Sequence, residues 1–429
     1  MTENSIKPTV LLMNDSFPPI IDGVANVTLN YAKEIQKTYG NAVVLTPDYP
    51  GVNDSGYPFM VRRYASIDTR KAVGYMAGVP FSPKQTAELK DSNIRLIHSH
   101  CPVASQILAR EIQQICDVPL IMTYHTKFDY DIQRCVKGKL LQDGAIRTLV
   151  DNISASDEVW AVSRGAGENL RSLGYEGDYV VMENGVDMEK RLAEEENVEA
   201  LRTRLGVPHG IPVYLFIGRM VWYKNQRIIL DALKRLAEEE KDFRFLMIGD
   251  GSDLLEMKAY TATLGLTDKV IFTGAIQDRE EIRSYYTLAD LLLFPSVFDT
   301  NGLVVREASA VSTPAVLVRG SSAAEGVTHG ENGFLIEENA ESLAALLTSL
   351  HGNEAYVRKV GDQAAEELYI SWEQAVKKAT ERYQIVIDRY RSGNNKKHHR
   401  FSFTEPAVKA MANLMDIFSI LGTKMSIWE

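Results

Sequence analysis

The sequence predicts an α/β protein built from two Rossmann-like, doubly wound parallel-sheet domains that face one another. Three observations predict this fold class. Short apolar runs alternate with amphipathic stretches, this alternation occurs twice, and a charged segment without a strand pattern separates the two series. The 429 residues, 45% of them apolar, are enough for two or three domains with buried cores.

The first half of the chain contains a series of short apolar runs, each followed by a turn. The stretches at 24–39 and 103–116 have the helical period that crossovers between parallel strands require. We therefore expect one parallel sheet within a domain that spans residues 1–188. The predicted strands lie at residues 8–13, 41–47, 94–100, 119–125, 157–163 and 178–184.

The second half repeats this scheme after the charged segment at 189–208. A second parallel sheet of similar size is expected within a domain that spans residues 189–370. Its predicted strands lie at residues 213–219, 243–251, 269–274, 290–296, 314–320 and 333–337. In such sheets ligands bind beyond the carboxyl ends of the strands, so the expected site is the cleft between the two domains.

Composition excludes several classes of protein. With 47 Lys and Arg against 57 Asp and Glu, the net charge of −10 argues against a nucleic-acid partner. Cys101, Cys116 and Cys135 lack C-x-x-C spacing, so neither a disulfide framework nor a zinc site is predicted. No apolar run is long enough for a signal peptide or a spanning helix, so we expect a cytoplasmic protein.

The most specific motif is the segment FPSVFDTNGLVVREASA at 294–310, which places Asp299 and Glu307 around a predicted strand-to-helix turn. If residues 300–303 open a helix, their free N–H groups would hold a diphosphate, and Glu307 would accept hydrogen bonds from ribose hydroxyls. Upstream, Arg219 and Lys224 follow a strand end, where two cations suit the same diphosphate. Capped helices and surface cations are the structural alternatives to both interpretations.

Three other patterns could indicate chemistry. Two G-x-G pairs suggest a dehydrogenase, but neither completes the dinucleotide fingerprint; they are Gly165 with Gly167, and Gly249 with Gly251. The D-x-D at 129–131 could bind a metal ion, but an acceptor-recognition role fits its place in the first half better. His125 ends a predicted strand and is a candidate catalytic residue, whereas His98 and His100 are as well explained as strand caps.

Together the Gly-Arg-x4-Lys-Asn segment, IGDGSD, the FTG turn and the acid-x7-Glu turn resemble glycosyltransferase family 4, over residues ~10 to ~390. The resemblance implies a GT-B fold, with an N-terminal acceptor domain and a C-terminal domain that holds the nucleotide sugar. It also implies retaining transfer without a bound metal or cofactor, the nucleotide sugar being a co-substrate. The residues HTKFDYD at 125–131 resemble the corresponding stretch of family members that glucosylate diacylglycerol.

The resemblance assigns roles to individual residues. Arg219 and Lys224 bind the donor diphosphate, Glu307 binds the ribose, and His125 contacts the donor sugar. Asp299 also contacts that sugar and stands where the family usually has Glu. Independently of the resemblance, we expect backbone N–H groups around Gly302 to stabilise the departing diphosphate; the residues concerned are Asn301, Gly302, Leu303 and Val304. Gly23 approaches the donor phosphate, and Asp22 replaces the first glycine of that loop.

The last part of the chain adds two predicted features. Residues 371–392 read as a long amphipathic helix, which the resemblance implies returns to the N-terminal domain. Residues 393–429 read as a basic linker followed by an apolar helix at 404–428, which could contact a membrane surface peripherally, its own protein or a second copy.

We therefore predict a retaining, metal-independent hexosyltransferase. It would use a UDP sugar as donor and a lipid or glycan hydroxyl as acceptor, in the cytoplasm or at the inner face of the membrane. A sugar-nucleotide epimerase of the same fold and a catalytically silent partner subunit stay open as alternatives.

Overall fold

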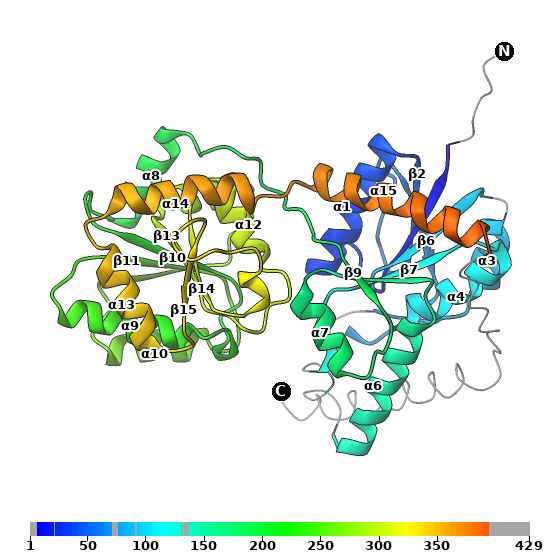
Figure 1. Cartoon of the computed structure of the whole chain (residues 1–429), viewed down its shortest axis with the longest axis horizontal. Helices are drawn as coiled ribbons and strands as arrows, with labels where there is room; N and C mark the ends of the chain where they lie inside the picture. Colours follow the sequence, from blue (N-terminus) through cyan, green and yellow to red (C-terminus); the bar gives the residue numbers. More distant parts are fainter. Residues whose placement is uncertain are drawn as a thin grey trace, which may run out of the picture. The chain divides into compact units, whose positions relative to one another are not determined.

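The computed structural model describes residues 7–20, 22–70, 76–90, 92–129, 132 and 137–393. The chain forms two compact units (Figure 1). Unit 2 runs from Asn184 to Ser371, and unit 1 comprises the chain before it together with the chain from Trp372 onward. The sequence had placed these two junctions after residues 188 and 370.

Unit 1 contains a seven-stranded parallel sheet in the order β3-β2-β1-β6-β7-β8-β9. Its strands are β1 (Thr9–Met13), β2 (Asn41–Pro47), β3 (Met60–Tyr64), β6 (Ile94–Ser99), β7 (Leu120–Tyr124), β8 (Glu158–Ala161) and β9 (Tyr179–Val181). The buried strands coincide with predicted apolar runs. The edge strand β3 was not predicted, because its side chains are mostly half-exposed and form no apolar run.

Helices and a small antiparallel pair, β4 (Ser66–Asp68) with β5 (Met76–Gly78), complete unit 1. Its helices are α1 (Gly23–Thr38), α3 (Pro83–Lys90), α4 (Ala104–Cys116), α6 (Lys139–Ser154), α7 (Arg164–Ser172) and α15 (Trp372–Arg391). Side chains on α4 pack against the sheet, where Leu108 and Ile112 join Leu11 and Ile97 in one buried cluster. The amphipathic periods at 24–39 and 103–116 are thus confirmed as helices that cover the sheet.

Unit 2 contains a six-stranded parallel sheet in the order β12-β11-β10-β13-β14-β15. Its strands are β10 (Val213–Ile217), β11 (Arg244–Ile248), β12 (Val270–Gly274), β13 (Leu291–Phe294), β14 (Ala315–Val318) and β15 (Phe334–Ile336). Its helices are α8 (Glu195–Leu205), α9 (Gln226–Glu238), α10 (Leu254–Thr263), α11 (Arg279–Leu288), α12 (Leu303–Ser309), α13 (Ala340–Leu350) and α14 (Glu354–Glu367). Figure 1 shows these helices on both faces of the sheet.

Both sheets reverse their strand order at an internal point. In unit 1 the chain winds outward from β1 on one side and from β6 on the other; in unit 2 the same happens at β10 and β13. Ligands of doubly wound folds bind at such a switch point, beyond the carboxyl ends of the two strands. The loops after β1, β6, β10 and β13 are therefore where the fold itself predicts binding.

Helix α15 confirms the predicted long amphipathic helix and packs on unit 1. Tyr383 lies within hydrogen-bond distance of His98, with 2.6 Å between its hydroxyl oxygen and Nδ1. Arg382 and Arg389 donate to the buried carboxylate of Glu158 at 2.7 and 2.8 Å. These contacts explain why a segment that follows unit 2 in sequence belongs to unit 1. The predicted linker and apolar helix at 404–428 lie outside the described residues.

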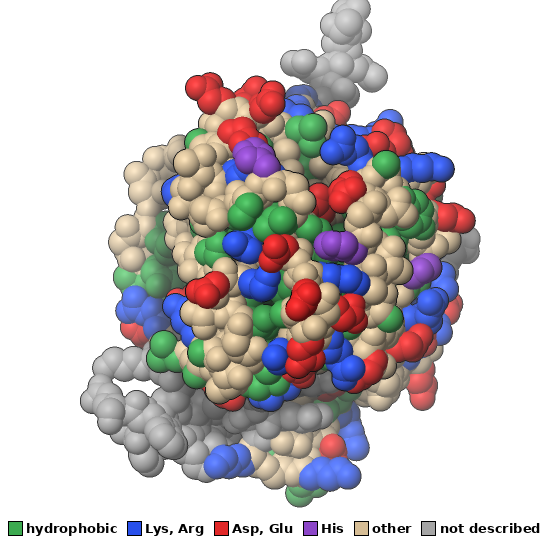
Figure 2. Space-filling view, turned by 90° about the vertical axis from the view of Figure 1, so that its left-hand side faces the viewer, with side chains coloured by type: hydrophobic (Ala, Val, Ile, Leu, Met, Phe, Trp, Pro, Cys, Tyr) green, Lys and Arg blue, Asp and Glu red, His purple; other side chains and the backbone are tan. Residues whose placement is uncertain are grey.

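Two surface properties bear on partners. No helix among the described residues combines the length and the apolar character needed to cross a bilayer. The face shown in Figure 2 interleaves acidic and basic side chains, without an extended field of one sign. That face therefore lacks the continuous basic stripe that contacts with a nucleic-acid backbone require.

Candidate functional site

The loop after β10 carries two predicted site residues, Arg219 and Lys224, and is held by its neighbours. Gln226 donates from Nε2 to the carbonyl of Arg219 at 2.9 Å. Asn225 donates from Nδ2 to the carbonyl of Pro295 at 3.0 Å, which ties this loop to the loop after β13. The Arg219 side chain is exposed. The loop backbone is thus fixed while this guanidinium stays accessible.

Close backbone contact explains the G-x-G pair after β11. A Cβ atom on Gly249 would lie 1.9 Å from the carbonyl oxygen of Gly218, and one on Gly251 would lie 2.4 Å from that of Met220. The amide of Met220 also donates to the carbonyl of Asp250 at 3.0 Å. These glycines let the loops after β10 and β11 touch, so their presence needs no dinucleotide.

Lys224 and Asp299 meet at the switch point of unit 2. The ammonium of Lys224 lies 2.9 Å from Oδ1 of Asp299, and the two side chains are 9% and 24% exposed. A buried ammonium without a counter-charge is costly, so this pair neutralises a lysine that the fold has taken out of water. The structure thereby joins two residues that the sequence had assigned separately.

The turn before α12 differs from the prediction. The helix begins at Leu303 and not at residue 300, because Gly302 adopts a left-handed conformation with φ of 55°. A Cβ atom there would also lie 2.9 Å from the Cβ of Ala323. Asn301 and Gly302 are thus loop residues, whereas Leu303 and Val304 open the helix. Asp299 lies in the loop before the helix, whereas Glu307 lies within it.

Glu307 is held by two residues that the sequence analysis missed. Arg279 donates from Nη2 to one carboxylate oxygen at 2.7 Å, and the Tyr286 hydroxyl donates to the other at 2.9 Å. Arg279 also donates to the carbonyl of Asp187 at 2.9 Å. The Glu307 side chain is 14% exposed, and its orientation is set from α11. No motif in the sequence links residues of α11 to this acid.

Several buried polar atoms beside the switch point have no partner in the structure. They lie on segments that follow β10, β13 and β14, and comprise Gln226 Oε1, Ser296 Oγ, Asp299 Oδ2, Asn301 Nδ2 and Ser321 Oγ. Buried polar groups in proteins usually have a partner. Their accumulation at one edge of one sheet indicates a place that a polar ligand or ordered water completes.

The loop after β1 in unit 1 leads into α1. Asp22 caps this helix, because its Oδ1 accepts a hydrogen bond from the amide of Ala25 at 2.7 Å. Gly23 is the first helical residue, and no atom lies within 4 Å of where its Cβ would stand. The carboxylate in the place of the family's first glycine is therefore engaged in capping, while Gly23 borders open space.

Three histidines lie at the ends of β6 and β7. His98 is placed between two hydroxyl groups, with Nδ1 2.6 Å from Tyr383 and Nε2 2.7 Å from Thr123. His100 Nδ1 lies 3.0 Å from His125 Nε2. Burial lowers the pKa of His125 to about 3 and the pKa values of the other two well below 6.5. All three rings are therefore neutral near pH 7.

The same edge of unit 1 buries a carboxyl group that the sequence analysis did not single out. Asp15 follows β1, and its Oδ1 accepts from the Tyr64 hydroxyl at 3.0 Å and from the amide of Ser105 at 2.7 Å. Burial raises the pKa of Asp15. Since Ser105 lies in the first turn of α4, this carboxyl caps a helix whose own N-cap residue, Val103, offers no side-chain bond.

Of the predicted D-x-D motif, the structure describes only Asp129. Asp129 accepts from Asn169 Nδ2 at 3.3 Å, and residues 130 and 131 lie outside the described part of the chain. Where the structure describes the chain, no group of three or more His, Cys, Asp and Glu side chains is arranged to hold a metal ion.

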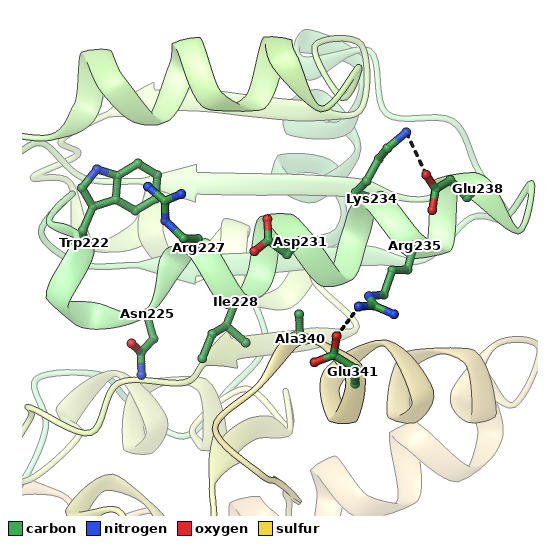
Figure 3. Close-up of a pocket in the computed structure, with 10 residues that line it drawn as sticks. All are labelled: Trp222, Asn225, Arg227, Ile228, Asp231, Lys234, Arg235, Glu238, Ala340 and Glu341. Carbon is green, nitrogen blue, oxygen red and sulfur yellow. Dashed lines mark hydrogen bonds and ion pairs between the residues drawn. The ribbon is translucent and has the colours of Figure 1, made fainter.

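A groove of about 750 Å³ opens between α9 and α13 (Figure 3). Four of its charged side chains pair with one another, Lys234 with Glu238 at 3.2 Å and Arg235 with Glu341. Trp222 and Asn225 reach it from the loop after β10, but Lys224 and Asp299 do not line it. The groove therefore belongs to the outer helical layer and not to the cluster at the switch point.

Two family models match consecutive parts of the chain. The model for Glycosyltransferase Family 4 matches residues 21–190, and the model for Glycosyl transferases group 1 matches residues 197–367. The chain belongs to glycosyltransferase family 4. Its activity is therefore glycosyl transfer, and its two parallel-sheet domains are those of a GT-B enzyme, as the sequence predicted.

Related proteins are similar over most of their length. An alpha-monoglucosyldiacylglycerol synthase of Streptococcus pneumoniae is 26% identical over 322 residues, covering 71% of this chain and 70% of the relative. A D-inositol 3-phosphate glycosyltransferase of Corynebacterium diphtheriae is 25% identical over 386 residues, covering 85% and 89%. Anabaena HepE, crystallised with UDP and glucose, has a TM-score of 0.69 at 19% identity, covering 88% of this chain and all of HepE. The structural similarity to HepE shows that the two proteins share their fold.

Proposed function

We propose that this glycosyltransferase moves a hexose from a UDP sugar to a hydroxyl acceptor, with retention of the anomeric configuration and without a bound metal. The observation that carries the proposal is the partly buried ion pair of Lys224 and Asp299 at the switch point of unit 2. It puts a cation beside the acid that we propose contacts the donor sugar, where doubly wound folds bind nucleotides.

Charge on the leaving diphosphate is the main electrostatic problem of the reaction. Arg219 offers an exposed, planar guanidinium, and Lys224 a compact ammonium on the same fixed loop. Both would stabilise the diphosphate as the glycosidic bond breaks, together with N–H groups of Leu303 and Val304 at the start of α12. Such preorganised charge is what a metal ion would otherwise supply.

Four other residues would contact the ribose, the sugar and the phosphate of the donor. Glu307, fixed by Arg279 and Tyr286, keeps oxygen lone pairs for the ribose hydroxyls, because each carboxylate oxygen can accept more than one bond. Asp299 keeps its unpartnered Oδ2 for a hydroxyl of the sugar. In unit 1, Gly23 would approach the donor phosphate and His125, neutral at pH 7, would bind a hydroxyl of the transferred sugar.

Retention needs no covalent enzyme intermediate in this scheme. The acceptor oxygen attacks the anomeric carbon on the face from which the diphosphate leaves, and the leaving phosphate oxygen takes the acceptor proton. The protein contributes orientation and stabilisation of charge. No side chain is then required as a nucleophile.

We propose a membrane lipid as the acceptor, with peripheral contact to the membrane. Helix α6 begins at Lys139 and carries Leu140 and Leu141 in its first turn, which are 86% and 51% exposed and directly follow the exposed Lys137 and Lys139. Exposed leucines next to lysines suit the interface of an anionic bilayer. The name of the pneumococcal relative supports the same acceptor class.

The proposal is tested by release of nucleoside diphosphate from a panel of UDP, GDP and ADP sugars. The assay contains EDTA and either anionic phospholipid vesicles with diacylglycerol, a glycan mixture or no acceptor. We expect lipid-stimulated UDP release, and a product with the donor's anomeric configuration by NMR. Release only with added metal, or an inverted product, would contradict the proposal.

A further inference from the structure

The loop after β1 is held by the edge strand β3, which the sequence analysis did not predict. Arg63 lies one residue before the end of this strand, and its side chain is 10% exposed. It donates from Nη2 to the carbonyl of Pro18, in the loop after β1, at 2.8 Å, and from Nη1 to the carbonyl of Pro47, at the end of β2, at 3.1 Å. One guanidinium thus joins the carboxyl ends of three neighbouring strands.

Asp54 supplies the charge that balances this guanidinium. Oδ2 of Asp54 lies 2.7 Å from Nε of Arg63, and Oδ1 of Asp54 lies 2.9 Å from Nη2. Such a two-bond pairing uses the planar fork of arginine and fixes the plane of the guanidinium. Arg63 can therefore donate to the two carbonyls in a fixed direction, which the single ammonium of a lysine could not do.

The anchor at Pro18 lies close in the chain to a residue that we propose to take part in the reaction. Phe17, the residue before it, is 2% exposed and packs against two aromatic side chains. Asp22 caps α1, and Gly23 follows directly. The backbone that leads to Gly23 is therefore set from both sides, by the bond to Pro18 and by the helix cap.

We propose that Arg63 is a positioning residue that holds the loop after β1 where Gly23 can meet the donor phosphate. The inference rests on the proposed function of Gly23. A small displacement of groups that orient a substrate can cost about 10²-fold in rate, so a loop that is fixed in advance favours turnover. Arg63 acts through the backbone of the loop and needs no contact with the substrate.

Four variants separate the loop anchor from the ion pair. Arg63→Met removes both. Asp54→Asn removes the charge of the pair but leaves Arg63 to donate to the two carbonyls. Arg63→Lys keeps the charge but lacks the fork. Arg62→Met is the matched control, because Arg62 lies next to Arg63 on β3 and pairs instead with Glu88 of α3.

We expect Arg63→Met and Arg63→Lys to lower kcat for a UDP sugar about 10- to 100-fold, whereas Asp54→Asn and Arg62→Met should keep near-normal kcat. The affinity for UDP, measured by calorimetry, should change much less, because the other proposed contacts with UDP come from unit 2. Hydrogen exchange of the backbone amides at 14–20 should become faster in the two Arg63 variants only. If Arg63→Met does not fold, because Asp54 has lost its counter-charge, the double variant with Asp54→Asn removes that charge and should fold with the same low kcat.

The inference is overturned if a folded Arg63→Met variant keeps the kcat of the wild type, or if its hydrogen exchange at 14–20 is unchanged. A kcat that falls equally in Asp54→Asn also overturns it, since kcat would then follow the ion pair and not the anchor. The proposed function fails in a different way, namely with a wild type that releases no nucleoside diphosphate from any donor. Hydrogen exchange then still decides whether Arg63 holds the loop.

Discussion

Replacing Asp299 by Asn should separate donor binding from turnover. In the structure Asp299 Oδ1 lies 2.9 Å from Lys224 Nζ, so a phosphate that binds the same ammonium comes close to a carboxylate. Two anionic oxygens on one ammonium are about 5 Å apart, and at an effective dielectric constant of about 20 they repel by about 3 kcal/mol. Because Asp299 is 24% exposed, we take about half of this, which corresponds to roughly tenfold in affinity.

We therefore expect UDP to bind Asp299→Asn about tenfold more tightly than the wild type, while turnover of the UDP sugar falls because the sugar loses an anionic acceptor. Isothermal titration calorimetry with UDP and a UDP-release assay measure the two effects. Asp242→Asn is the matched control, since Asp242 pairs with Lys269 at 2.6 Å just before β11, at the opposite end of the strands. Equal or weaker UDP binding by Asp299→Asn would refute the reasoning.

Three further predictions concern the ribose contact, stability and the membrane. Glu307→Gln should weaken UDP binding about tenfold in the same calorimetric assay, and Arg279→Met should weaken it less, because Tyr286 still orients the acid. Below pH 6.5 an unfolded histidine takes up a proton that buried His98, His100 and His125 do not. These histidines therefore do not change the free energy of unfolding above pH 6.5. Below that pH they decrease it, by about 4 kcal/mol for all three together at pH 5.5. Urea unfolding at pH 7.5 and 5.5 measures this loss, which should be about a third smaller in His125→Gln. Leu140→Gln with Leu141→Gln should reduce sedimentation with anionic vesicles, whereas Leu255→Gln, another exposed leucine, should not.

The parallel sheets were predictable because buried strands appear in the sequence as short runs of apolar residues. Runs such as residues 291–294 and 315–318 are apolar throughout, since both faces of a parallel sheet are covered. The edge strand β3, from Met60 to Tyr64, forms no such apolar run because most of its side chains are partly exposed to solvent. The start of α12 was misplaced by three residues, although Gly302 is a common signal for a break in helical conformation.

The site was predictable residue by residue but not as a set of contacts. Lys224 and Asp299 were each expected at strand ends, yet their ion pair depends on which strands are neighbours in the sheet. The support of Glu307 by Arg279 and Tyr286 depends on how α11 packs, which no local pattern encodes. Asp22 was noted only as a replacement for the first glycine of its loop, and its role as a helix cap became clear from its bond to Ala25.

The most direct test of the central claim is the rate of UDP release by Lys224→Met. Lys224 is proposed to stabilise the leaving diphosphate, so its loss should lower kcat by about 10²-fold or more, the usual cost of removing one preorganised transition-state contact. Lys269→Met, which breaks the Lys–Asp pair beyond the opposite end of the sheet, should keep near-normal turnover. A Lys224→Met variant that releases UDP at the wild-type rate would contradict the assignment of the donor site.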